Sequence, residues 1–341
     1  MESSRIDRNG KRWNRREFLQ HASSAAVLAL RPSRSVAARL EPMTFGLCAD
    51  VHQDVMHDAP ERLQTFVRAM EDRGARFIAQ LGDFCIPSPA NQSFLDVFHS
   101  FRGKHHHVLG NHDTDSENLT KNGYSQNETK AFWGIESNYY AFVEGGIRFL
   151  VLDGNDRPAD WGTDYPLHIG EAQLAWLENE LIGSDEPVIV LSHQSAENAE
   201  GLDNGDRVRA LLEAANRRAG WQRVLACFSG HHHLNYAVEI NAIPYVQVNS
   251  MSYFWVGEAC QNFAYPKRIH ARRPMLEFTA PYKDPVWSTV TVDPGAGEIR
   301  IEGRQSDWAG KSPEELGYTS PEPRRRGMSP KSDDRTIAIR S

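Results

Sequence analysis

Residues Thr44–His52 read TFGLCADVH, and this stretch decides the class of fold. The run of apolar and small residues predicts a buried β-strand, and the polar Asp50 and His52 follow it directly. The same arrangement, in which an apolar run ends in Asp, Asn or His, recurs four times along the chain. The recurrences read FIAQLGD (77–83), HVLGNHD (107–113), VIVLSH (188–193) and RVLACFSGHHH (223–233).

Helical patterns separate these runs. In Glu61–Arg73, apolar residues recur at the spacing of one helix face, namely Leu63, Phe66, Val67 and Met70. We expect further helices at 91–101, 171–181 and 207–218, a hairpin at 139–143 and 147–153, and short antiparallel strands at 237–240, 245–249, 287–292 and 299–301. Strands that alternate with helices predict a layered α/β fold, in which helices cover mixed β-sheets.

The polar residues at the strand ends can lie close together in such a fold. The carboxyl ends of parallel strands meet in one crevice, where layered α/β proteins bind their ligands. Each cluster taken alone also fits a turn or a helix cap, and a histidine run also fits an exposed loop. Five clusters at five strand ends favour one shared site.

The order of the five clusters, DxH, GD, GNHD, H and GHxH, resembles that of the calcineurin-like metallophosphoesterases. The resemblance covers the chain from Thr44 to His233. It implies two mixed β-sheets packed as a sandwich and flanked by helices, within a domain that we place at 39–305. The related purple acid phosphatases usually carry a tyrosine ligand three residues after the bridging aspartate, where this chain has Ile86. The chain therefore fits the DxH branch that lacks this ligand.

The resemblance implies two metal ions, which share Asp83 as a bridging ligand. One ion would be held by Asp50, His52, Asp83 and His233, and the other by Asp83, Asn111, His193 and His231. Imidazole nitrogens together with carboxylate and amide oxygens suit Mn, Fe or Zn better than Ca or Mg. His232, which stands between two of these residues, is expected to point away from the ions.

The same resemblance implies a metal-dependent phosphoester hydrolase. A hydroxide that bridges the metals would attack phosphorus, His112 would protonate the leaving oxygen, and Asp113 would orient the His112 imidazole. Phosphomonoesters, phosphodiesters and pyrophosphates are open as substrates, and we expect loops 114–138 and 251–286 to select among them. The alternatives are a structural turn histidine at 112 and a metal-binding module without activity. No HExxH pattern occurs, which argues against a metallopeptidase.

Charge is unevenly distributed over the 341 residues. Residues 39–305 contain 23 Lys and Arg and 36 Asp and Glu, a net charge of −13. This negative net charge argues against nucleic acid as a partner, because nucleic-acid binding requires a basic surface. A phosphorylated small molecule, nucleotide or lipid head group would need metal ions to offset that charge. No apolar run reaches the roughly 18 to 20 residues of a membrane span.

Residues 1–38 resemble a twin-arginine signal peptide. Arg15 and Arg16 precede Phe-Leu, a short apolar stretch follows at 22–30, and small residues at 35–38 suit cleavage by a signal peptidase. A basic tail with a chance Arg-Arg pair is the alternative. The signal implies the twin-arginine export machinery as a partner and a periplasmic or extracellular location. At the other end, 306–341 is expected to be a disordered polar tail.

Three further features carry open interpretations. The run His105–His107 is expected in an exposed or partly buried loop before the third strand. The aromatic residues of 251–265 fit core packing better than the wall of a substrate pocket. The four cysteines occur singly, and Cys48 and Cys227 lie in apolar runs, where a free cysteine is usually a small buried hydrophobe. No zinc-thiolate site is expected.

Overall fold

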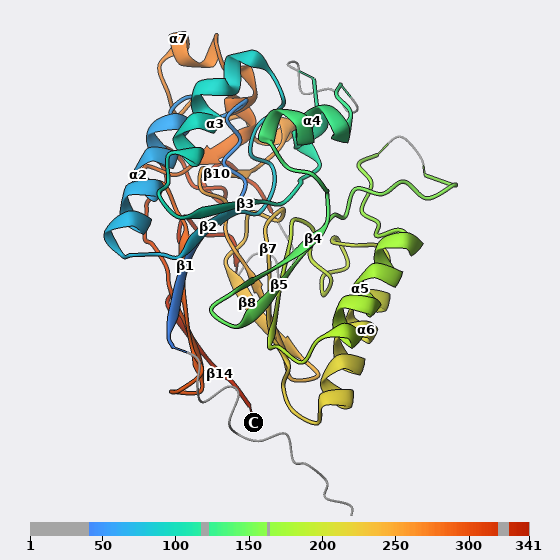
Figure 1. Ribbon diagram of the computed structural model, residues 1–341. Coiled ribbons are helices and arrows are strands. Elements are labelled where there is room, and N and C mark those ends of the chain that lie inside the picture. Colours follow the sequence, from blue (N-terminus) through green and yellow to red (C-terminus); the bar gives the residue numbers. More distant parts are fainter. Residues whose placement is uncertain (1–40, 117–122, 162–163, 320–326, 341) are drawn as a thin grey trace, which may run out of the picture. The chain divides into compact units, whose positions relative to one another are not determined.

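Two six-stranded β-sheets pack face to face in the computed structural model, which describes residues 41–116, 123–161, 164–319 and 327–340 (Figure 1). The first sheet has the strand order β14-β13-β12-β1-β2-β3. Its strands are β1 (Met43–Cys48), β2 (Phe77–Gln80), β3 (Lys104–His107), β12 (Ser288–Asp293), β13 (Glu298–Glu302) and β14 (Arg335–Ala338). β1, β2 and β3 are parallel, and each of the other three strands runs antiparallel to its neighbours.

The second sheet has the order β4-β5-β6-β7-β9-β8. Its strands are β4 (Tyr140–Glu144), β5 (Ile147–Leu152), β6 (Val188–Ser192), β7 (Val224–Ser229), β8 (Tyr236–Ile240) and β9 (Ile243–Gln247). The four central strands are parallel, and the edge strands β4 and β8 are antiparallel to their neighbours. Both sheets are therefore mixed, as the sequence predicts, although β9 lies parallel to β7 where we expected only antiparallel strands.

The inner faces of the two sheets meet in an aromatic core. Phe45 of β1 stacks on Phe77 of β2 with ring centroids 4.7 Å apart. The edge of the Phe45 ring meets Phe149 and Phe228 of the facing sheet, at 5.4 and 6.3 Å. All four rings are fully buried. The two sheets thus form the expected sandwich, which fixes the strand ends relative to one another.

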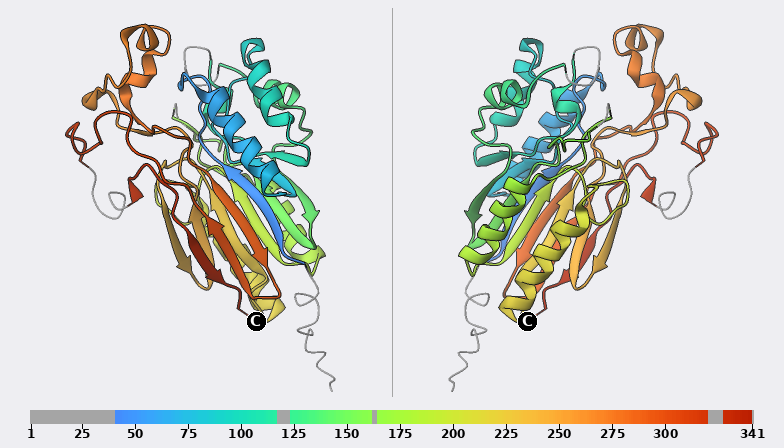
Figure 2. Two further views of the ribbon diagram at one scale, coloured as in Figure 1. Left: turned by 90° about the vertical axis from the view of Figure 1, so that its left-hand side faces the viewer. Right: turned by 90° about the vertical axis from the view of Figure 1, so that its right-hand side faces the viewer.

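Helices cover the outer face of each sheet (Figures 1 and 2). α2 (Ala59–Asp72) and α3 (Gln92–His99) pack on the first sheet, where Gly46 of β1 lets Met70 and Phe66 of α2 approach the strand. α5 (Glu171–Gly183) and α6 (Gly205–Ala219) pack on the second sheet. The remaining elements are α4 (Gln126–Trp133), α7 (Lys267–His270), β10 (Tyr253–Trp255), β11 (Thr279–Pro281) and the 3₁₀ turns η2 (Pro89–Asn91), η3 (His112–Thr114), η4 (Glu258–Cys260) and η5 (Pro274–Phe278).

The C-terminal segment is ordered where we expected a disordered tail at 306–341. β14 pairs antiparallel with β13, and Ile337 packs against the core between the sheets. Met328 is also buried. Half-buried and exposed residues alternate over Arg335–Ala338, so the segment packs one face when it extends the sheet edge. The tail prediction is wrong for the described residues 306–319 and 327–340, because average composition conceals so short a strand.

The histidine run forms the third strand instead of preceding it. Lys104–His107 is β3 and pairs parallel with β2. His106 stacks on Phe142 of the second sheet with ring centroids 3.5 Å apart, and burial lowers its pKa to about 3. His107 is buried and stacks on Trp133. The loop prediction is wrong because neutral imidazoles pack between aromatic rings as ordinary core residues do.

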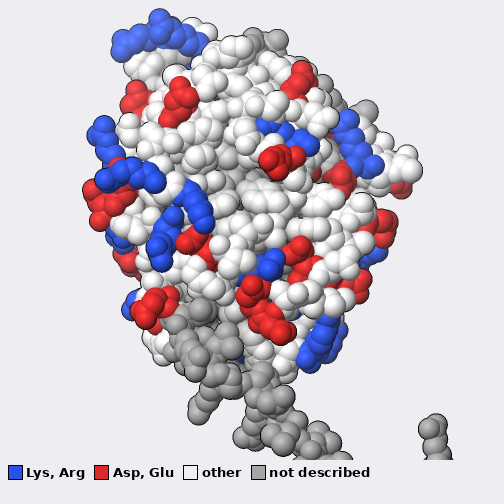
Figure 3. Space-filling view, in the orientation of Figure 1, with Lys and Arg blue, Asp and Glu red and all other residues white. Residues whose placement is uncertain are grey.

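The proposed signal peptide at 1–38 lies outside the described residues. In the part of the chain that the structure describes, no helix is both long and apolar enough to cross a membrane. Cys48 and Cys227 are buried, as expected. Lys and Arg side chains are interspersed with Asp and Glu over the face shown in Figure 3. The exclusion of nucleic acid as a partner stays a prediction.

Candidate metal centre

The seven predicted ligands all follow the carboxyl ends of strands. Asp50 and His52 follow β1, Asp83 follows β2, Asn111 follows β3, His193 follows β6, and His231 and His233 follow β7. Within each sheet these strands are parallel and end at the same edge. Packing of the two sheets brings both edges together, so the structure gathers all seven side chains in one place.

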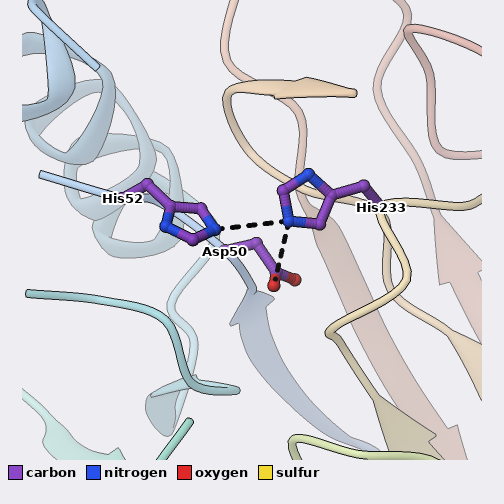
Figure 4. A group of neighbouring side chains, drawn as sticks. All are labelled: Asp50, His52 and His233. Atoms are coloured by element: carbon purple, nitrogen blue, oxygen red, sulfur yellow. Dashed lines mark hydrogen bonds and ion pairs between the residues drawn. The ribbon is translucent and has the colours of Figure 1, made fainter. Parts of the chain in front are cut away.

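Asp50, His52 and His233 form the first group of facing side chains (Figure 4). Nε2 of His52 lies 3.3 Å from Nε2 of His233, which lies 3.3 Å from Oδ1 of Asp50. The two imidazoles point toward each other from the segments after β1 and β7. Because all three side chains are buried and aim their ligand atoms at one point, they can hold a cation.

Asp83, His193 and His231 form the second group. Nε2 of His193 lies 3.3 Å from Oδ2 of Asp83 and 3.2 Å from Nδ1 of His231. Oδ1 of Asn111 lies 3.0 Å from the same His193 nitrogen. This group therefore offers two nitrogens, a carboxylate oxygen and an amide oxygen to a second cation.

Asp83 stands between the two groups. Its Oδ2 atom lies 3.7 Å from Nε2 of His52 in the first group and 3.3 Å from Nε2 of His193 in the second. Its other oxygen, Oδ1, accepts a hydrogen bond of 2.8 Å from the backbone N–H of His112. One carboxylate oxygen thus faces a histidine of each group, which is the position that a bridging ligand requires.

Backbone carbonyls fix the orientation of two imidazoles. Nδ1 of His193 donates to the carbonyl of Leu81, and Nδ1 of His233 donates to the carbonyl of Tyr253, both at 2.7 Å. These bonds leave Nε2 of each ring as the nitrogen directed into the site. Hydrogen bonds of this kind accompany metal-bound histidines and set their tautomer.

The backbone at the site is strained. Five of the seven residues adopt left-handed conformations, with φ between 50° and 76°: Asp50, His52, Asp83, His231 and His233. Such conformations cost on the order of 1 to 3 kcal/mol each for residues other than glycine, and they concentrate at functional sites. Gly82 and Gly110 have no room for a Cβ atom, because His193 and Asp83 lie directly against them. The local structure therefore holds these side chains in place against their backbone preference.

Burial and mutual charge set the protonation of the site. Burial lowers the pKa of His52 and of His231 well below the ordinary value. Burial raises the pKa of Asp83, but the positive charges of His193 and His112 outweigh it and hold that pKa well below its usual range. Burial lowers the pKa of His193, and the Asp83 carboxylate outweighs it and raises the pKa to about 9. His193 is therefore protonated at neutral pH, and a metal ion that binds its Nε2 atom would displace that proton, because neutral imidazoles and ionised carboxylates are the forms that bind metal ions.

His112 lies beside the two groups, and its carboxylate partner is Asp115. Nδ1 of His112 lies 2.5 Å from Oδ2 of Asp115. The Tyr165 hydroxyl donates to the same oxygen at 3.0 Å and lies 3.3 Å from Nδ1 of His112. The prediction that Asp113 orients His112 is wrong, because the 3₁₀ turn at 112–114 turns Asp113 away and places the residue three positions after His112 against the imidazole.

The surroundings of His112 favour its protonated form. Burial lowers its pKa, but the charge of Asp83 and the hydrogen bond with Asp115 outweigh burial and raise the pKa above the ordinary value. Since Asp115 and Tyr165 contact Nδ1, Nε2 is the nitrogen of this ring that remains for a further partner. A protonated imidazole with one free N–H has the form required of a general acid.

Asp113 holds the loops of the site together. Its fully buried carboxylate accepts backbone hydrogen bonds of 2.7 to 3.1 Å from Asp83, Phe84, Cys85 and Gly110. Burial, together with the charge of Asp83, raises the pKa of Asp113 to about 8. The side chain connects the segment after β2 to the segment after β3, and so acts on the structure of the site.

We expect Asp113→Ala to destabilise the protein and Asp115→Asn to leave its stability nearly unchanged. The alanine leaves buried N–H groups without an acceptor, which lowers the free energy of unfolding by on the order of 3 kcal/mol. Calorimetry should then show Tm falling by roughly 6 to 12 °C. Asp115→Asn keeps an acceptor for His112 and Tyr165, so it should lower turnover with a much smaller change in Tm. Equal Tm losses in both variants would contradict this division of roles.

Part of each group and His112 line a cavity of about 400 Å³, which we call the metal cavity; the group members in its lining are His52, His233, Asp83 and His231. One side of it is apolar and aromatic, formed by Val55, Met275, Tyr253, Phe254 and Trp255. Tyr253 stacks on His52 with ring centroids 5.1 Å apart. Three aromatic residues of 251–265 therefore wall the cavity, where we favoured core packing alone. Phe254 also belongs to a buried apolar cluster.

His232 belongs to neither of the two groups that the described residues form. Its Nε2 atom lies 3.1 Å from Oγ of Ser195, although its side chain also borders the metal cavity. That His232 points away from the ions stays a prediction.

Asp115 and Tyr165 are site residues that our sequence reasoning missed. Asp115 follows His112 by three positions, a spacing that brings two side chains together in a tight turn and that could have indicated the pair. Tyr165 comes from the long segment between β5 and α5, and no local pattern there indicates a contact with His112.

Comparison with known proteins identifies the family and agrees with the fold. The sequence model described as calcineurin-like phosphoesterase matches residues 43–235. Among solved structures, a dimetal phosphatase from Danio rerio superposes with a TM-score of 0.55 at 16% identity, covering 87% of this chain and 99% of that chain. GAP50, the anchor in the inner membrane complex of Plasmodium, superposes with a TM-score of 0.48 at 13% identity, covering 88% of this chain and 90% of that chain. A search of curated proteins finds no match.

Proposed function

This chain belongs to the calcineurin-like phosphoesterase family, and from that premise we propose an exported enzyme with a dinuclear metal centre in which His112 acts as the general acid. Family membership makes the protein a metal-dependent phosphoester hydrolase. The proposal adds which residues bind the metal ions, that His112 is the general acid, and that the protein is exported. One observation carries the ligand set: Oδ2 of Asp83 lies 3.7 Å and 3.3 Å from a histidine nitrogen in the first and the second group.

The side chains present fit two metal ions of the Mn, Fe or Zn kind. The site combines histidine nitrogens, carboxylate oxygens and one amide oxygen, a mixture that suits these metals. Asp50, His52, Asp83 and His233 would hold one ion, and Asp83, Asn111, His193 and His231 the other. When bound, two such ions supply a hydroxide nucleophile near neutral pH and neutralise charge on the phosphoryl oxygens.

The chain's own residues would position the substrate and move the proton. Asp115 and Tyr165 hold the His112 ring through Nδ1, so Nε2 can donate to the leaving oxygen. Asn111 and Asp83 keep the metal ligands next to His112, since Asp83 accepts the backbone N–H of that residue. The aromatic side of the metal cavity excludes water from one flank of the reacting group.

Turnover by the purified full chain tests the hydrolase. The chain is stripped with a chelator, reloaded with Mn²⁺, Fe²⁺ or Zn²⁺, and assayed with bis(4-nitrophenyl) phosphate and 4-nitrophenyl phosphate. We expect activity to disappear with the metals and to return on reloading. The ratio of the two rates shows whether the enzyme prefers phosphodiesters or phosphomonoesters. Hydrolysis of a nucleotide pyrophosphate alone would favour the alternative, a pyrophosphatase. Two bound metals without turnover of any of these would favour the binding module.

The proposal that the protein is exported has its own support and test. Paired arginines, an apolar stretch and small residues follow one another within 1–38 in the order of a twin-arginine signal. We expect fractionated cells to contain the wild-type protein in the exported fraction. Arg15→Lys combined with Arg16→Lys should retain it in the cytoplasm, and unchanged export of this variant would contradict the twin-arginine route.

A further inference from the structure

The chain from β10 to β11, residues 253–281, has an inner side that is packed on the domain. β10 pairs antiparallel with β11, and η4, α7 and η5 lie between them in the sequence. Ile269 of α7 packs against the apolar core that α2 and α3 share with the first sheet. Tyr253, Trp255 and Met275 line the metal cavity. We call residues 253–281 the α7 segment.

Two aromatic side chains of the α7 segment are exposed to solvent. Phe263 is 65% exposed, more than any other large apolar side chain of the described residues, and Trp255 is 39% exposed. A single exposed apolar side chain is ordinary on a protein surface. Here two aromatic side chains share one short segment with a group of cations, and this combination calls for a partner that can accept both.

The cations of the α7 segment lack internal partners. The segment contains four Lys and Arg and two Asp and Glu, within a domain whose net charge is −13. Lys267, Arg268 and Arg272 are exposed, and none of them forms an ion pair within the described part of the chain. The fourth cation, Arg273, donates to the carbonyl of Asp54 at 3.2 Å. Figure 3 shows Lys and Arg side chains together at its upper left, where Figure 1 places α7.

We propose that the α7 segment docks the protein on an anionic lipid surface. Phe263 and Trp255 would lie at the level of the lipid head groups, where aromatic side chains are favoured. Lys267, Arg268 and Arg272 would face the lipid phosphates, which attract Lys and Arg near the surface. The acidic remainder of the domain is repelled by the same surface, so only this segment can approach it.

A second copy of the chain fits the α7 segment less well. On the face shown in Figure 3, the acidic side chains away from α7 are mixed with basic ones, so that face offers no anionic surface to match the cations. An anionic bilayer offers both a uniform negative charge and an apolar interior for aromatic side chains. Since Trp255 and Met275 also line the metal cavity, docking would place the lipid surface beside that cavity.

Binding of the full chain to lipid vesicles tests the proposal with charge variants. We compare vesicles of phosphatidylcholine with vesicles of equal parts phosphatidylcholine and phosphatidylglycerol, and expect binding to the second kind that weakens as salt is added. Lys267→Glu combined with Arg268→Glu should lower the partition coefficient by at least about tenfold, since each cation near an anionic surface contributes about fivefold. Residues 1–38 are the same in every variant, so they do not affect this ratio.

The matched control reverses two exposed cations elsewhere. Arg217→Glu combined with Arg218→Glu makes the same change in net charge at the end of α6, far from α7 in all three views (Figures 1 and 2). This control should change the partition coefficient by less than about twofold, because charges beyond a Debye length from the surface are screened. Equal losses in the two double variants, or equal binding to both kinds of vesicle, would overturn the proposal.

A tryptophan at position 263 reports whether this part of the chain enters the lipid. Phe263→Trp should bind as the wild type does and add fluorescence that brominated acyl chains quench. Ile182→Trp, at a 54% exposed position on α5, should add fluorescence that they do not quench. Equal quenching at the two positions would overturn the proposal. A dimer that Lys267→Glu disrupts, without vesicle binding, would assign the segment to a second copy instead. These measurements need no turnover, so their failure leaves the proposed hydrolase standing.

Discussion

Replacing Asp83 by asparagine is expected to lower kcat/KM by at least about 10³-fold and to remove at least one of two bound metal ions. Oδ2 of Asp83 faces His52 and His193, one from each group. The amide that replaces the carboxylate has almost the same shape, but it has no negative charge, and it can direct N–H groups where a cation must bind. Metal content by mass spectrometry and turnover of the same protein sample measure both effects.

A control variant distinguishes loss of the metal ligand from loss of the fold. Asp96→Asn on the exposed part of α3 makes the same chemical change outside the site and should leave metal content and kcat/KM within about twofold of wild type. Circular dichroism should show both variants folded. Two metals per chain in Asp83→Asn would contradict the bridging position, even if the activity were lost.

The strand ends were the part of the site that sequence could reveal. An apolar run followed by Asp50 and His52 predicts a strand and a polar loop, and parallel strand ends must converge in a layered sheet. The structure confirms both sheets and brings Asp83, His193 and the other predicted residues together. This inference succeeded because it depends on topology, which a one-residue error in a strand boundary does not change.

The predictions that were wrong concern side chains whose contacts depend on the backbone of one turn or on a residue far away in the sequence. Whether Asp113 or Asp115 faces His112 depends on the backbone of a single 3₁₀ turn, and the neighbouring aspartate faces the amides of 83–85 instead. His106 looks like a loop residue until Phe142 of the other sheet packs on it. Left-handed φ values at aspartate and histidine have no signature in sequence, because their cause is the closeness of elements far apart along the chain.

Replacing His112 by alanine is expected to lower kcat by about 10²- to 10⁴-fold while both metals stay bound. His112 belongs to neither ligand group of the described residues, and its side chain lines the metal cavity. A general acid matters most when the leaving oxygen is strongly basic. The loss should therefore be larger for an alkyl or phenyl ester than for the matching 4-nitrophenyl ester. Steady-state kinetics across such a series, with metal content measured on each sample, tests this.

A graded series of variants separates a proton donor from a residue that merely fills space. Asp115→Asn weakens the hydrogen bond that raises the pKa of His112, and Tyr165→Phe removes only the hydroxyl beside it. An acid must be protonated, so the rate falls as pH rises through its pKa. Asp115→Asn should move that fall to lower pH, and His112→Ala should abolish it. Equal losses for all leaving groups, with an unchanged basic limb of the pH profile, would assign proton donation to water and leave His112 a structural residue.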